Sequence, residues 1–167
     1  MKKEEQIKSL KDFQKNVFKA YKTLGYNTDN SNTIFGIIIE MRNLVSAAEQ
    51  QDTILLHKFM GLCCEHVANY CTVNNIDFSK VVDKTHALIE EQTFLTDLEY
   101  YLEKIKNDLS FVQDMKDSDR IEFIQKCWVC IFPEEYCEDF IKIDRILKAT
   151  IEDNKIKYPQ AYFDGPK

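Results

Sequence analysis

Residues 33–78 read TIFGIIIEMRNLVSAAEQQDTILLHKFMGLCCEHVANYCTVNNIDF, and this stretch decides the fold. Apolar side chains recur every three or four residues along both of its halves, which is the spacing of one face of an α-helix. The two stripes are Ile34, Ile37, Ile38, Met41, Leu44, Val45 and Ala48, then Leu55, Phe59, Leu62, Cys63, Val67 and Tyr70. Asp52 can cap the second helix, and Asn74 with Asn75 breaks it. The pattern therefore predicts a helix over about residues 33–50 and a second helix between Asp52 and Asn74.

The flanking segments show the same periodicity. Upstream, a helix is predicted over about residues 4–24, with Gly25 as its C-cap. Downstream, Asp77 or Ser79 can cap a fourth segment, and leucine, isoleucine and valine form a coiled-coil-like seam over residues 95–112. A short helix is predicted over residues 119–132, a last helix over about residues 134–157, and a tail over residues 158–167.

Composition supports the same fold class. The chain has 167 residues, of which 44% are hydrophobic, enough for one domain with a proper core. Only 4 Gly and 3 Pro are present, whereas folds built from many strands and turns need more of both. We therefore expect a single all-α domain, a bundle of about five to seven helices.

The charge balance argues against nucleic-acid binding. The formal net charge is -6, and no concentrated basic face offsets it, although a nucleic-acid groove must neutralise phosphates with clustered Lys and Arg. No apolar stretch approaches the length of a membrane span, and the basic N-terminal residues precede no apolar segment. We expect a cytoplasmic protein with neither a nucleic-acid nor a membrane partner.

The six cysteines suggest two kinds of site besides buried thiols. Cys127 and Cys130 form a Cys-x-x-Cys, which could serve redox chemistry or zinc binding. Bulky apolar residues surround the pair, no βαβ scaffold is evident, and a zinc site would need further ligands from Cys137, His66 or Cys71. We favour reduced, buried structural thiols.

A set of short motifs follows in order along the first half of the chain: Gly25-Tyr26, Glu40 with Ala47-Ala48, the Gln50-Gln51-Asp52 turn, and a helix with Gly61 that closes at Asn75-Ile76-Asp77. This order resembles the MazG-like all-α nucleoside triphosphate pyrophosphohydrolases. The resemblance covers a core of about residues 4–91, with added helices over about 94–157. The family is expected to hold Mg²⁺ with Glu-x-x-Glu on one helix and Glu-x-x-Asp on the next, because this cation prefers hard oxygen ligands.

The resemblance places this metal signature on residues that mostly cannot bind metal. The first pair falls on Glu40 and Asn43, and the second falls on Phe59 and Leu62. Phenylalanine and leucine cannot ligate a hard cation, so we do not expect the Mg²⁺ cluster that is typical of the family. Glu65, one turn beyond Leu62, could replace a ligand in a shifted register.

The ending Asn154-Lys155-Ile156-Lys157-Tyr158-Pro159 resembles the basic close of these domains. In the family a Lys or Arg there can meet the triphosphate, so the resemblance implies Lys155 and Lys157 as substrate-binding residues. A separate acidic group, Glu99 and Glu103 with neighbours, is better interpreted as a solvated helix face than as a carboxylate site.

Two functions follow from these residues. The first, which we favour, is a MazG-like protein that has lost catalysis and acts as a binding or scaffold module, with residual nucleotide binding or a protein partner. The second is an active pyrophosphohydrolase that uses Mg²⁺, Glu40 and non-standard acids such as Glu65. The seam over residues 95–112 is long enough to pack against a second copy, so we also expect a homodimer.

Overall fold

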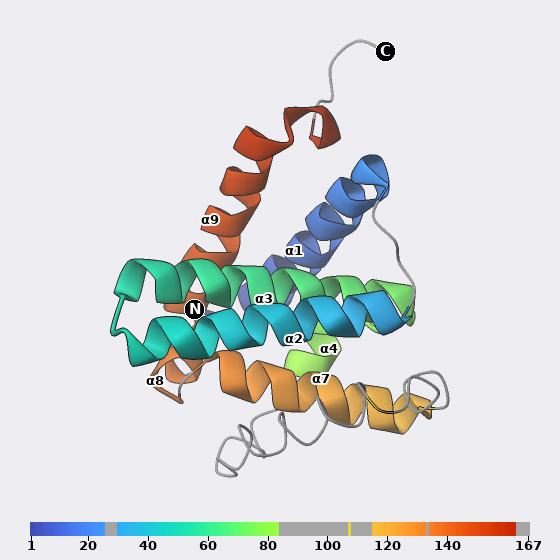
Figure 1. The fold of residues 1–167 in the computed structure, drawn as a ribbon, viewed down its shortest axis with the longest axis horizontal. Helices are drawn as coiled ribbons and strands as arrows, with labels where there is room; N and C mark the ends of the chain where they lie inside the picture. Colours follow the sequence, from blue (N-terminus) through green and yellow to red (C-terminus); the bar gives the residue numbers. More distant parts are fainter. Residues whose placement is uncertain (26–29, 84–106, 108–114, 133, 163–167) are drawn as a thin grey trace.

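The computed structural model describes residues 1–25, 30–83, 107, 115–132 and 134–162. These residues form seven α-helices, a short 3-10 helix and no strand, which confirms the all-α prediction (Figure 1). The elements are α1 (Lys3–Leu24), α2 (Asn30–Glu49), α3 (Thr53–Val73), α4 (Phe78–Asp83), α7 (Asp117–Ile131), α8 (Glu134–Glu138), α9 (Phe140–Lys157) and η2 (Pro159–Ala161). The seam predicted over residues 95–112 and the acidic face around Glu99 lie outside the described residues, Asn107 excepted.

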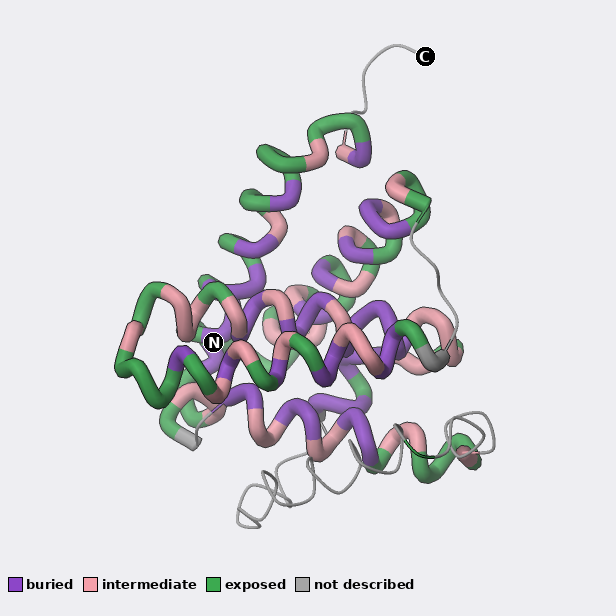
Figure 2. Tube along the Cα trace, viewed as in Figure 1, coloured by how far each residue is buried: buried purple, intermediate pink, exposed green. Residues whose placement is uncertain are grey.

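Helix α3 is the centre of the bundle. It lies antiparallel beside α2 and also contacts α1, α4, α7 and α9 (Figure 1). Buried residues therefore occur on most of its faces (Figure 2), and Cys63, Cys64 and Val67 are 0% exposed. The mixed composition of this helix, with small, apolar and few charged side chains, suits contact on several sides.

An aromatic cluster joins α1, α4 and α7. The ring centroids of Phe13 and Phe78 lie 6.4 Å apart, and those of Phe78 and Trp128 lie 5.5 Å apart in an edge-to-face arrangement. Trp128 also packs against Phe132, with 4.7 Å between centroids. These separations are typical of favourable aromatic pairs. The cluster fixes α7 against the N-terminal half of the chain.

The predicted helix ends are confirmed at three places. Gly25 has φ 68°, a left-handed conformation in which its N–H caps the end of α1. The Asp52 carboxylate accepts a hydrogen bond of 3.1 Å from the backbone N–H of Leu55 at the start of α3. Asn74 is the C-cap of α3, and Asn75 turns the chain with φ 56°.

The last predicted helix differs from the structure. Instead of one helix over residues 134–157, the chain forms α8 and α9, separated at Asp139. Asp139 has extended backbone, and its carboxylate accepts a hydrogen bond of 3.2 Å from the N–H of Ile141. Aspartate competes for backbone donors in this way, so it begins a new helix rather than continuing the old one.

The start of the predicted tail is ordered against the bundle. Pro159–Ala161 forms η2, which contacts α1 and α9, and Ala161 is 2% exposed. The Tyr162 hydroxyl lies 3.5 Å from the backbone oxygen of Asn16.

The cysteines are free thiols, and four of them are buried: Cys63, Cys64, Cys71 and Cys127. Burial raises the pKa of the Cys127 thiol, so little reactive thiolate forms near neutral pH. Cys130 is only partly buried. These surroundings agree with structural thiols at Cys127. No helix in the described part of the chain is long and apolar enough to cross a membrane.

Candidate functional site

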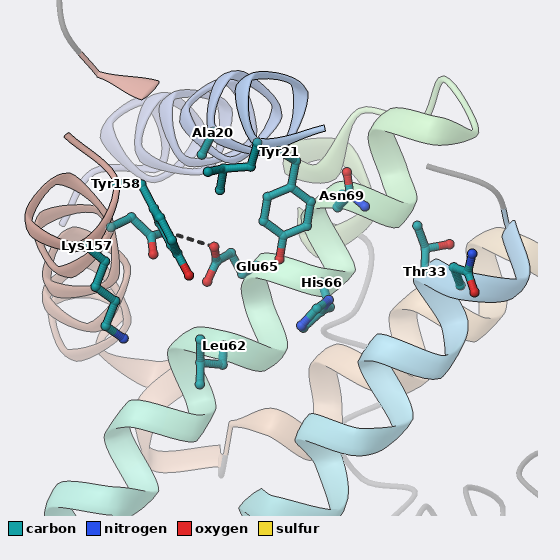
Figure 3. A pocket seen from close by; sticks show the side chains of 12 residues that line it. Ala20, Tyr21, Thr33, Leu62, Glu65, His66, Asn69, Lys157 and Tyr158 are labelled. Carbon is teal, nitrogen blue, oxygen red and sulfur yellow. Dashed lines mark hydrogen bonds between the residues drawn. The ribbon is translucent and has the colours of Figure 1, made fainter. Parts of the chain in front are cut away.

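A polar cavity lies where α1, α2, α3 and α9 meet. Its volume is about 330 Å³. The polar side chains that line it include Tyr21, Thr33, Glu65, His66, Asn154 and Lys157. Figure 3 shows Glu65 and Tyr158 turned toward the space between α3 and α9, with Lys157 at its side.

Glu65 is the buried acid of this cavity, with 5% of its surface exposed. Its Oε1 accepts a hydrogen bond of 2.8 Å from Nδ2 of Asn154, which is also buried (Figure 3). Burial raises the pKa of Glu65 to about 7, although the Asn154 hydrogen bond and the charge of Lys157 act in the opposite direction. Near neutral pH this carboxyl group therefore exists in both its protonated and its ionised form.

His66 contributes a neutral ring to the same cavity. Burial lowers its pKa to about 4, so the imidazole is uncharged at neutral pH. The ring lies edge-to-face against Tyr21, with centroids 6.0 Å apart. It also lies over Gly36 of α2, where a Cβ atom would come within 2.5 Å of Nδ1. Glycine at position 36 is what allows this imidazole to sit between the two helices.

Glu40, the one acid that the resemblance places at a metal-binding position, does not line this cavity. It lies on α2, partly buried, and its Oε2 is buried without a hydrogen-bond partner among the described residues. Burial raises the pKa of Glu40, while Asn43 and Lys58 lower it. Glu40 also raises the pKa of Glu65, so the two carboxyl groups lie close enough to interact electrostatically.

Phe59 and Leu62, onto which the resemblance places the second metal-binding pair, are both apolar. Phe59 is partly buried and packs against the core, whereas Leu62 lines the cavity wall. Within the described residues, no three His, Cys, Asp or Glu side chains are grouped so that they could hold a metal ion.

The two lysines predicted to bind substrate differ in position. Lys157 lines the cavity, and its charge acts on Glu65. Lys155 instead forms an ion pair of 3.0 Å with Glu152 one turn earlier on α9, and it does not line the cavity.

Sequence reasoning missed several polar residues of the cavity. Tyr21 and Asn69 were not predicted as site residues, and His66 was considered only as a possible zinc ligand. Asn154 was not predicted as the partner of Glu65. One signal was present: Glu65 and Asn69 are four residues apart, so they place polar groups on one face of an otherwise apolar helix. The partner on α9 is 89 positions away and could not be inferred from spacing.

No family model, curated protein or solved structure matches this chain.

Proposed function

We propose that this protein is a MazG-like helical binding module that holds a nucleotide without hydrolysing it. The observation that carries the proposal is the cavity in which Glu65 pairs with Asn154 beside a neutral His66. Such groups recognise a ligand through hydrogen bonds, whereas a hydrolase of this family needs a cluster of ionised carboxylates around metal. Of the four positions at which the resemblance places that cluster, three carry Asn43, Phe59 and Leu62, and only Glu40 is an acid.

The cavity chemistry suits a heteroaromatic base. A carboxyl group that gains and loses its proton near neutral pH can both donate and accept, and buried amides of Asn69 and Asn154 add further donors and acceptors. Tyr21 and Tyr158 supply aromatic surface in the cavity wall. Lys157 is then the cation that meets the ligand's phosphates, in a cytoplasmic protein with access to nucleotides.

Direct nucleotide binding, measured by titration calorimetry without metal, tests this proposal. We expect nucleoside triphosphates to bind. Asn69→Ala should lower their affinity about tenfold, because it removes a buried polar contact. Lys157→Ala should also weaken binding, whereas Lys155→Ala is the matched control and should not. If no nucleotide binds, or if the two lysine variants lose equal affinity, this cavity is not a nucleotide site.

The second candidate is an active pyrophosphohydrolase, favoured by the electrostatic interaction between Glu40 and Glu65. In that case pyrophosphate would be released from a nucleoside triphosphate with Mg²⁺ or Mn²⁺, and Glu40→Ala would abolish the release. A pure binding module releases no pyrophosphate, which is the result we expect of the wild type. Pyrophosphate release that depends on Glu40 would show that the protein is an enzyme and would refute the binding module.

We also propose that the protein is a homodimer. The support is the apolar seam over residues 95–112, whose spacing suits packing against a second helix. Size-exclusion chromatography with light scattering should give about twice the 19.7 kDa of the chain. A mass that stays at that of one chain when the protein is concentrated would contradict the dimer.

A further inference from the structure

A second, larger hollow lies between α3, α8 and α9. Its volume is about 690 Å³, within the range of small-molecule sites. The cationic side chains that line it are Lys58 of α3 and Lys142, Arg145 and Lys157 of α9. Asp153 is the one carboxylate among the described lining residues. We call this hollow the basic groove.

Its charge is opposite to that of the chain. The protein has a formal net charge of -6, yet four cations face one acid in the basic groove. None of the four forms a direct ion pair with a carboxylate in the part of the chain that the structure describes, although the charges of Lys58 and Lys157 act on Glu40 and Glu65. Elsewhere on α9, Lys148 and Lys155 do form such pairs, with Asp144 at 2.8 Å and Glu152 at 3.0 Å. Gathered cations that form no direct ion pair with a carboxylate attract an anion from solution.

The wall contributed by α8 is already organised. The Tyr136 hydroxyl lies 2.8 Å from Nε2 of His57 on α3, so a hydrogen bond bridges the two helices. Lys142 Nζ lies 5.2 Å from the centroid of the Tyr136 ring, a cation–π contact that holds this lysine at the groove. A site whose side chains are held in place before binding loses less entropy when the ligand arrives.

We propose that the basic groove binds a small molecule that bears two or more phosphate groups. Arginine matches a phosphate with two parallel hydrogen bonds, and lysines add point charges, so Arg145 with Lys58 and Lys142 supplies the recognition that such a ligand needs. The apolar side chains of Leu62 and Ile146 line the same groove and suit the organic part of the ligand. The groove has the volume of a small-molecule site and the chain as a whole is acidic, so a small anion fits better than a nucleic acid.

The groove does not depend on the proposed nucleotide cavity. The two hollows share Leu62, Asn154 and Lys157 in their walls, but Lys58, Lys142 and Arg145 line the groove alone. Tripolyphosphate has no base, so it probes the groove without using the contacts of Asn69. Nucleoside triphosphate binding that is weakened in Arg145→Gln but unchanged in Asn69→Ala would remove the proposed function and leave the groove.

The test is titration calorimetry of the full chain with sodium tripolyphosphate. We expect binding that weakens with added salt, and a loss of about tenfold in each of Arg145→Gln and Lys142→Gln. Arg42→Gln is the matched control, because Arg42 is an exposed arginine on α2 that does not line the groove, and it should leave the affinity unchanged.

Three results would overturn the groove. One is absence of tripolyphosphate binding by the wild type at low salt. Another is a loss in Arg42→Gln equal to that in Arg145→Gln, which would show a response to net charge alone. The third is citrate binding as tight as that of tripolyphosphate, which would show that the groove recognises negative charge and not phosphate.

Discussion

Replacing Glu65 with Gln will make the protein progressively more stable relative to wild type as pH rises from 4.5 to 8. The difference in unfolding free energy between variant and wild type should grow by about 3 kcal/mol over this range, because a pKa change of one corresponds to about 1.4 kcal/mol. Glutamine keeps an oxygen that can accept the hydrogen bond from Asn154, but it has no charge to be buried. The substitution therefore keeps this hydrogen bond and removes the buried negative charge.

The sign of this pH dependence follows from the number of protons that Glu65 binds in the folded and unfolded states. In the folded protein the pKa of Glu65 is raised from its ordinary value of 4.5 to about 7 by burial. Between these two values the folded state binds more protons than the unfolded state, so wild-type stability falls as pH rises. Below pH 4.5 both states hold the proton, and above pH 7 the full cost of the buried charge is present. The glutamine of the variant does not titrate and has no such dependence.

His66 acts in the opposite direction. Burial lowers its pKa from 6.5 to about 4, so between these values the unfolded state binds more protons and stability rises with pH. The two groups nearly cancel between pH 4.5 and 6.5 in the wild type. In Glu65→Gln the contribution of His66 is no longer cancelled, so the variant itself should gain stability as pH rises toward 6.5.

Urea denaturation at pH 4.5, 6 and 8 measures these differences. Glu49→Gln is a suitable control, because Glu49 is an exposed carboxylate at the end of α2. Its difference from wild type should stay within about 0.5 kcal/mol at every pH. A constant offset between Glu65→Gln and wild type, without growth between pH 4.5 and 8, would show that Glu65 is not held in a buried environment.

The Gly61→Ala variant will be less stable than wild type by about 1 to 3 kcal/mol, the usual cost of adding a methyl group to a packed contact. In an open helix the same change would stabilise by up to about 1 kcal/mol. Here α3 meets α9 at Gly61, and a Cβ atom would collide with Oγ1 of Thr150 and lie 3.3 Å from its Cβ. Thr150 is itself fixed, since its hydroxyl donates a hydrogen bond of 2.8 Å to the oxygen of Ile146.

A double-mutant cycle isolates this contact. Thr150→Ala removes Oγ1 and Cγ2, so it makes room for the new methyl group. We expect Gly61→Ala combined with Thr150→Ala to be more stable than the sum of the two single changes by about 1 to 3 kcal/mol. Thermal or urea unfolding gives all four free energies. Strictly additive effects would mean that α3 and α9 do not approach closely at Gly61.

Local chemistry explains which parts of the fold were predictable. The stripe of α2, the Asp52 cap and the Gly25 C-cap depend on residues within a few positions of one another, so the sequence alone reveals them. The isolated glycine within α3, Gly61, is likewise best explained by close packing between helices. The break at Asp139 was missed, since the apolar spacing continues through it and only the side-chain hydrogen bond reveals the new start.

The candidate site was less predictable, because it is assembled from distant segments. Glu65 was considered only as a replacement metal ligand, and its burial against Asn154 depends on how α9 crosses α3. The basic groove likewise combines Lys58 with Lys142 and Arg145, which lie far along the chain on another helix. The expectation that the chain has no concentrated basic face was therefore wrong at this groove. No spacing rule within one helix can bring such residues together.

The Asn154–Glu65 hydrogen bond has a consequence for the order of events during synthesis. Helix α3 leaves the ribosome well before α9 is translated, so for that interval Glu65 has no amide partner and the cavity lacks its Lys157 wall. The carboxyl group then remains in water as an ordinary ionised glutamate. Closing α9 over α3 is the step at which the nascent chain acquires both hollows, because each takes part of its wall from that helix.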